Sequence, residues 1–171
     1  METWDAIRSR RNVRVYSDRP IAEQDLDRIL EAGRRSPSGG NRQRWDFVVC
    51  TDRQQLEALS KVWRGAGHVA SSAATIALLA PQSDDAGTTA SIQYDLGQTT
   101  MAMMLAAADL GIGSGHAAAR DEELAREVLG HGADRRCAYL IALGYPADRP
   151  LAPIKQPNRR PFDDVVHRGR W

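Results

Sequence analysis

The sequence predicts an α+β fold, for three reasons. A helical pattern begins at about residue 23, and short apolar runs typical of strands follow, mixed with further helical patterns. These elements lack the strict strand–helix–strand repetition of a parallel α/β fold. The 171 residues are 42% hydrophobic, which suffices for one core, so we expect residues 1–171 to form a single domain.

The first expected helix covers residues 23–33, because Leu26, Ile29 and Gly33 fall on one face at helical spacing. Residues 36–41 hold a proline and two glycines, which cannot continue this helix and predict an irregular loop. The loop separates the helix from the first strand.

Two apolar runs rich in β-formers, residues 45–50 and 74–79, predict the first two strands. Between them, Asp52 can cap a helix that runs to about Trp63. Residues 84–87 predict a turn or a short mobile loop after the second strand.

The longest expected helix covers about residues 91–110, with Gly111 at its C′ position. Its main apolar positions recur every three to four residues, at Ile92, Leu96, Met103, Ala107 and Leu110. Further alanines and methionines make it apolar nearly all round, so we expect it to be buried on several sides, one of them at a subunit interface. Residues 111–115 predict a flexible turn.

Asp121 can cap a short helix that ends near Gly130, and residues 137–143 predict a third strand. From residue 147 onward four prolines exclude a long helix, so residues 147–171 are expected to form an extended tail. Because this tail contains apolar residues, it needs a surface to lie on, either its own domain or a partner's.

The composition argues against several classes of function. The net charge of +1 argues against a nucleic-acid or acidic-surface partner. No apolar run reaches the ~20 residues that span a bilayer, and the start of the chain shows no secretory signal pattern. Cys50 and Cys137 are expected to be reduced core thiols of a cytoplasmic protein, with a disulfide or reactive pair as the alternative. The four histidines lack metal-ligand spacing, so no metal is expected.

Arginines crowd the start of the chain, at Arg8, Arg10, Arg11 and Arg14. Guanidinium groups are planar, permanently charged and suited to phosphate, with a solvated basic face as the alternative interpretation. A second pair, Arg159–Arg160, lies in the proline-rich tail, so the two clusters could converge on one anion.

Two glycine-containing loops offer backbone N–H groups. Residues 37–43 add a hydroxyl and two amides, which suit the polar edge of a heterocycle, with an ordinary turn as the alternative. Residues 111–115 lead into His116 and three alanines, whose small side chains leave the backbone open to a flat ligand. His116 is either a substrate contact or a surface histidine.

Five segments resemble the motifs of the nitroreductase family of FMN enzymes, in the same order and over nearly the whole chain. They are residues 10–16 (RRNVRVY), 36–45 (SPSGGNRQRW), 110–114 (LGIGS), 143–146 (LGYP) and 159–167 (RRPFDDVVH). Each motif alone is a weak signal, but five in order are a specific match.

This resemblance implies a nitroreductase-like sandwich, in which helices flank a central, mostly antiparallel sheet. It also implies a homodimer with two FMN molecules at the interface and with residues 147–171 crossing onto the partner subunit. By the match, the residues near the phosphate, ribityl chain and pyrimidine edge are Arg10, Arg11, Asn12 and Arg14, with Arg159 at the phosphate. The residues that would reach the flavin from the partner subunit are Pro37, Ser38, Gly39 and Asn41. A backbone N–H at Ala118 or Ala119 would lie near flavin N5.

The activity that the resemblance implies is that of an NAD(P)H-dependent FMN oxidoreductase. NAD(P)H would pass hydride to flavin N5 and leave, and a nitroaromatic or quinone would then be reduced, in a ping-pong scheme that needs no side-chain acid or base. The alternatives are a flavin-binding storage or regulatory protein without efficient turnover, and a nucleic-acid-binding module suggested by the N-terminal arginines alone. The chain differs from the family at Arg44, where proline is usual, and in the short segment 82–90, which has no room for the extra helices of longer members.

Overall fold

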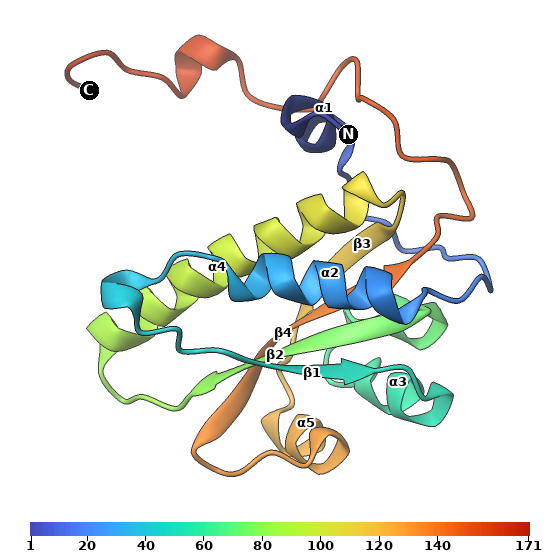
Figure 1. Ribbon diagram of the computed structural model, residues 1–171. Helices are drawn as coiled ribbons and strands as arrows, with labels where there is room; N and C mark the ends of the chain where they lie inside the picture. The colour runs from blue at the N-terminus through green and yellow to red at the C-terminus, as the bar shows by residue number, and fades with distance from the viewer.

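The computed structural model describes residues 1–171, which form a mixed arrangement of helices and strands (Figure 1). The helices are α1 (Thr3–Ser9), α2 (Glu23–Arg34), α3 (Arg53–Leu59), α4 (Ala86–Asp109) and α5 (Glu122–Leu129). The strands are β1 (Asp46–Cys50), β2 (Ala74–Pro81), β3 (Gly113–Ala118) and β4 (Arg135–Gly144). Short 3₁₀ helices occupy Gly39–Asn41, Gly67–Ser71 and Phe162–Asp164.

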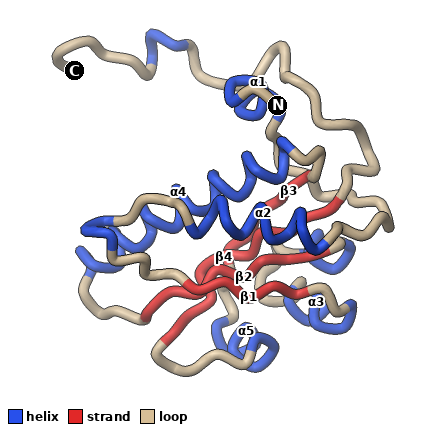
Figure 2. The backbone as a smooth tube through the Cα atoms, viewed as in Figure 1, coloured by secondary structure: helices blue, strands red, loops and turns tan.

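The four strands form one antiparallel sheet in the order β1-β2-β4-β3, so β1 and β3 are its edges. Helices α2 and α4 cover one face and α3 and α5 the other (Figure 2). Strand side chains alternate between two apolar cores: Ile76 and Ile141 pack with α2 and α4, whereas Ala77 and Leu140 pack with α3 and α5. The predicted α+β sandwich with an antiparallel sheet is confirmed.

Several predicted helix ends are confirmed by their hydrogen bonds. Asp52 accepts from the Gln55 N–H at the start of α3, and Asp121 accepts from the Leu124 N–H at the start of α5. Gly111 follows α4 with φ of 72°, the left-handed conformation of a C′ glycine.

Two helix boundaries and one whole helix differ from the expectation. Of the turn or loop expected at residues 84–87, residues 84 and 85 precede α4, but residues 86 and 87 already belong to it, because Asp85 accepts from the Thr88 N–H at 2.6 Å and the helix begins at Ala86. Helix α3 ends at Leu59 rather than near Trp63. Helix α1 was not predicted, because its seven residues are too few to show a clear apolar period.

The expectation of a flexible turn at residues 111–115 is wrong beyond Gly111. Gly113 and Gly115 belong to the edge strand β3, and both lie against Val13. A Cβ atom would lie 2.7 Å from Val13 Cγ2 at the first glycine and 2.4 Å from the Val13 carbonyl oxygen at the second. Gly113 therefore leaves room for the Val13 side chain, and Gly115 permits a close approach of two backbones, instead of forming a turn.

The chain after β4 contains one short 3₁₀ helix, Phe162–Asp164, and leaves the body of the domain (Figure 1). Its Ile154 N–H donates to the Arg8 carbonyl at 3.0 Å, and beyond that point Phe162 and Trp171 are exposed. No helix of the structure has the length and apolar character to cross a membrane. Cys50 and Cys137 are buried and free, as predicted.

Candidate functional site

The arginine-rich segment is attached to the outer edge of β3. The Val13 N–H donates to the Ser114 carbonyl at 2.9 Å, which forms a parallel bridge between Asn12 and Ser114. The Tyr16 hydroxyl donates to the Val13 carbonyl at 2.8 Å and lies 3.3 Å from the Ala142 carbonyl. These bonds fix the backbone from which the side chains of Asn12 and its arginine neighbours extend.

Two adjoining cavities lie beside this segment, and both are lined by Arg10 and Met101. The first, which we call the arginine cavity, has a volume of about 580 Å³. It is lined by Trp4, Ile7, Arg8, Arg10, Met101, Leu105, Ile154, Pro157 and Arg159. The second, the His116 cavity, has a volume of about 300 Å³ and is lined by Arg10, Gln93, Gly97, Thr100, Met101, Met104, His116 and Tyr139. Arginines from both ends of the chain thus meet in one groove.

The electrostatics of the groove favour an anion. Burial, and then the charge of Arg159, lowers the pKa of Arg10, so two guanidinium groups repel each other at this point. Burial, and then the charges of Arg10 and Arg14, lowers the pKa of His116. An anion placed among these groups would offset the mutual repulsion of the cations.

The structure brings together most of the predicted phosphate-side residues. Arg10 Nη1 lies 3.3 Å from Asn12 Oδ1, and Arg159 lines the arginine cavity beside Arg10. Arg11 turns elsewhere: its Nη2 donates to Asp148 Oδ1 at 2.8 Å and to the Arg149 carbonyl at 2.6 Å. Arg11 therefore attaches the start of the tail to the rest of the domain through these two hydrogen bonds.

The two predicted backbone donors, Ala118 at the end of β3 and Ala119 directly after it, differ in orientation. The Ala119 N–H donates to the Ala138 carbonyl at 3.3 Å and so points toward β4. Because N–H groups alternate between the two sides of an antiparallel strand, the Ala118 N–H points to the free edge of β3. Ala118 is therefore the better placed of the two to donate to a ligand outside the sheet.

The predicted loop residues Pro37, Ser38, Gly39 and Asn41 lie on the other side of α4. The Gly39 N–H donates to Asp95, whereas Arg10 contacts Met104 at 3.9 Å. Asp95 and Met104 are nine positions apart, about two and a half turns, and so lie on opposite flanks of the helix. The loop and the arginine groove of one chain are therefore separated by α4.

Several residues of the groove were not predicted as site residues. The sequence marks Arg8 only as part of a basic cluster, and it allows His116 to be either a substrate contact or a surface residue. Tyr139 and Gln93 gave no signal in the sequence, yet the Tyr139 hydroxyl donates to Gln93 Oε1 at 2.6 Å in the wall of the His116 cavity. Their position follows from the register, which places Tyr139 on β4 opposite Ala118.

Comparison with known proteins identifies the family. Residues 7–83 match the Nitroreductase family. Over 99% of its length the chain is 34% identical to a protein of Archaeoglobus fulgidus named "Putative NADH dehydrogenase/NAD(P)H nitroreductase", of which it covers 99%. The chain belongs to the nitroreductase family. The family predicted from the five motifs is therefore confirmed.

Solved structures of other proteins share the fold of this nitroreductase family member. An FMN-dependent nitroreductase from Clostridium difficile R20291 is 22% identical, with a TM-score of 0.85 and coverage of 98% of this chain and 99% of that chain. The NADPH:FMN oxidoreductase of Vibrio harveyi complexed with NAD+ is 23% identical, with a TM-score of 0.86 and coverage of 99% and 77%. The present nitroreductase family member joins β2 to α4 by residues 82–85 alone, so no extra helix is inserted there.

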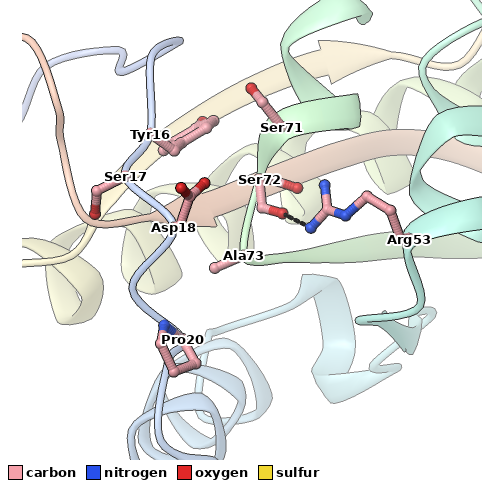
Figure 3. A pocket seen from close by; sticks show the side chains of 8 residues that line it. All are labelled: Tyr16, Ser17, Asp18, Pro20, Arg53, Ser71, Ser72 and Ala73. Carbon is pink, nitrogen blue, oxygen red and sulfur yellow. Dashed lines mark hydrogen bonds between the residues drawn. The ribbon is translucent and has the colours of Figure 1, made fainter.

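A separate polar cavity of about 420 Å³ lies away from the predicted flavin residues (Figure 3). Arg53, in its wall, donates to the carbonyls of Ala70 and Ser72, the latter at 2.8 Å, and so caps the end of the 3₁₀ helix Gly67–Ser71. Asp18 also lines the cavity but forms no ion pair with Arg53. The arginine here has a structural role in this nitroreductase family member.

Proposed function

We propose that this protein is an FMN-dependent oxidoreductase that transfers reducing equivalents from NAD(P)H to a small organic acceptor of the nitroaromatic or quinone type. The observation that carries the proposal is the convergence of Arg8, Arg10 and Arg159 on a cavity that continues into the His116 cavity. Guanidinium groups recognise a phosphate well, since they offer several donors in a planar array. The name of the Archaeoglobus fulgidus relative, which includes NAD(P)H, supports the electron donor, and the name of the Clostridium difficile structure, which includes FMN, supports the cofactor.

The groove fits the parts of FMN. Arg10 and Arg159 would hold the phosphate, and Asn12 and Arg14 would lie along the ribityl chain and the pyrimidine edge. The apolar walls of the two cavities suit a flat aromatic ring, and their volumes lie within the range of cofactor sites. FMN, when bound, accepts hydride from a reduced nicotinamide and passes reducing equivalents to a second substrate. The outward N–H of Ala118 would donate to the flavin where negative charge develops.

The site is proposed to be completed by a second copy of the chain. The outward side of α4 lies between the arginine groove and the loop, and it exposes Tyr94 (72%) and Met101 (45%). A homodimer that buries this side would bring Pro37, Ser38, Gly39 and Asn41 of one subunit to the groove of the other. The tail of residues 147–171, with its exposed apolar side chains, would cross onto the partner subunit.

The protein is proposed to act in the cytoplasm, where two free cysteines stay reduced. The reaction is proposed to be ping-pong, because one groove must serve both the nicotinamide and the acceptor. Purified protein should carry or take up FMN and show oxidised-flavin absorbance. NADH or NADPH should bleach that absorbance under anaerobic conditions, a quinone should restore it, and initial rates should give parallel double-reciprocal lines.

The outcomes separate the proposals. Protein that neither contains nor binds FMN would contradict the flavin assignment. Bleaching without reoxidation by any nitroaromatic or quinone would contradict the acceptor and favour a flavin-binding protein without efficient turnover. Arg159→Ala should lose FMN affinity, while Arg168→Ala, farther along the same exposed tail, serves as the matched control. Sedimentation of the FMN-loaded protein as a monomer would contradict the shared site.

A further inference from the structure

Asp95 is a buried charge in α4 to which the proposed reaction gives no role. The residue is 3% exposed in a helix whose other buried side chains are mostly apolar. Its two carboxylate oxygens lie 3.1 and 3.3 Å from the Gly39 nitrogen, and it takes part in none of the ion pairs of the structure. A buried carboxylate without a cation destabilises a fold relative to an apolar side chain of similar size. Stability alone therefore does not account for a carboxylate here.

The loop that Asp95 holds has a strained backbone. Gly40, Asn41 and Gln43 have φ angles of 59°, 55° and 48°, in the left-handed region. This conformation costs an asparagine or glutamine roughly 1–2 kcal/mol, and such residues persist where their surroundings enforce them. Strained backbone of this kind often occurs at ligand-binding positions.

Within the loop, hydrogen bonds close the chain on itself. The Gln43 N–H donates to Ser38 Oγ at 2.9 Å, and the Asn41 N–H donates to the Ser38 carbonyl at 2.9 Å. The bond from Gly39 to Asp95 is the one that attaches this closed unit to α4. The loop also presses on the helix one turn earlier, because a Cβ atom at Gly39 would lie 3.3 Å from Ser91 Oγ.

We propose that Asp95 is a positioning residue, whose carboxylate holds the loop Ser38–Gln43 on α4 in the conformation that presents Ser38, Gly39 and Asn41 to the flavin of the partner subunit. The inference rests on the proposed flavin site. Asp95 acts through the Gly39 N–H and does not itself touch the flavin. Because the Gly39 N–H needs an oxygen acceptor at this position, an apolar side chain in place of Asp95 would release the strained loop.

Two substitutions distinguish positioning from packing. Asp95→Asn keeps an oxygen that can accept from Gly39 and should leave FMN affinity within about threefold of wild type. Asp95→Leu fills the space without an acceptor and should weaken FMN binding by about tenfold or more, since a hydrogen bond to a charged group is lost. The leucine variant should unfold at the same temperature as wild type or higher, because it removes a buried charge. Ser91→Ala, which removes a neighbouring hydroxyl without breaking a bond to the loop, is the control.

The readouts are FMN titration of the apo-protein by fluorescence, visible circular dichroism of the bound flavin, and thermal unfolding. A fourth readout needs no flavin: the amide resonances of Gly39 and Gly40 in protein labelled with ¹⁵N-glycine. These resonances should shift in Asp95→Leu and stay near their wild-type positions in Asp95→Asn.

Wild-type FMN affinity in Asp95→Leu, or unchanged glycine resonances, would overturn the positioning role. Equal losses of affinity and thermal stability in both variants would also overturn it, because that pattern reports packing. If the wild-type protein binds no FMN, the flavin site of the proposed function fails and with it the presentation of the loop to a flavin. The glycine resonances still decide whether Asp95 holds the loop.

Discussion

Gly115→Ala is the sharpest test of how β3 supports the arginine segment. The added Cβ would lie 2.4 Å from the Val13 carbonyl oxygen and 3.1 Å from both His68 Nε2 and Tyr16 Oη. Real Cβ contacts do not fall below 3.0 Å, so the Val13 backbone must retreat by at least the difference, 0.6 Å, between 2.4 and 3.0 Å. That carbonyl is backbone and accepts the Tyr16 hydroxyl at 2.8 Å, so it cannot rotate away as a flexible side chain would.

The expected cost follows from these contacts. Overpacking of a close-packed site costs about 1–3 kcal/mol, and loss of one buried hydrogen bond adds about 1 kcal/mol. Gly115→Ala should therefore lower the free energy of unfolding by about 2–4 kcal/mol. Because the displaced backbone leads directly into Arg14, FMN affinity should fall by about tenfold or more in the variant that remains folded.

Urea unfolding of the apo-protein and fluorescence titration with FMN measure the two effects. Gly67→Ala is the matched control, since nothing lies within 4 Å of a Cβ at that exposed position, and it should change neither quantity by much. A free energy of unfolding for Gly115→Ala within about 0.5 kcal/mol of wild type would show that the docking of Val13 against Gly115 is not as close as described.

Three further predictions concern other groups. Arg159→Ala should raise the Kd for FMN by about 10–100-fold, as loss of a charged hydrogen bond implies, and an unchanged Kd would remove Arg159 from the phosphate site. Burial lowers the pKa of His68 below 6.5, so as the pH falls the unfolded chain binds a proton before the folded chain does, and the free energy of unfolding decreases below pH 6.5 from its full value above it. His68→Gln should flatten that decrease in urea titrations between pH 7 and 5. Burial raises the pKa of Cys50 to about 11 and that of Cys137 to about 12, so neither thiol should react with Ellman's reagent at pH 8 until denaturant exposes both. Rapid reaction of the native protein would contradict this prediction.

The parts of the fold that could be predicted from the sequence are those with local signals. The apolar spacing of residues 23–33 repeats from one turn of α2 to the next, the cap residues Asp52 and Asp121 act within the first turn of their helices, and the structure confirms each of these elements. The start of α4 was missed because its first residues, 86–90, carry no apolar period and only the cap at Asp85 marks the boundary. A helix start that depends on one side chain is a weaker signal than a repeated face.

The candidate site depends more on contacts between distant segments. The five motifs contain the predicted site residues, but the meeting of Arg10 with Arg159 requires the tail to return along α1, through the bond from Ile154 to Arg8. Residue type alone does not predict whether an arginine side chain points into the site, as Arg11 shows. It follows Arg10 directly, yet its guanidinium turns to Asp148, which no local pattern in either segment predicts.

The orientation of the backbone donor at Ala118 also depends on contacts between distant segments. Two successive strand residues turn their N–H groups to opposite sides, so the register decides whether Ala118 or Ala119 faces outward. That register is compatible with the site only if Val13 can pack against the strand, and the missing side chain of Gly115 permits this. Gly115, which predicts a flexible turn in the sequence, therefore supports the register that turns the proposed donor toward the flavin. A one-residue slip of that register would turn the Ala119 N–H outward in place of the Ala118 N–H.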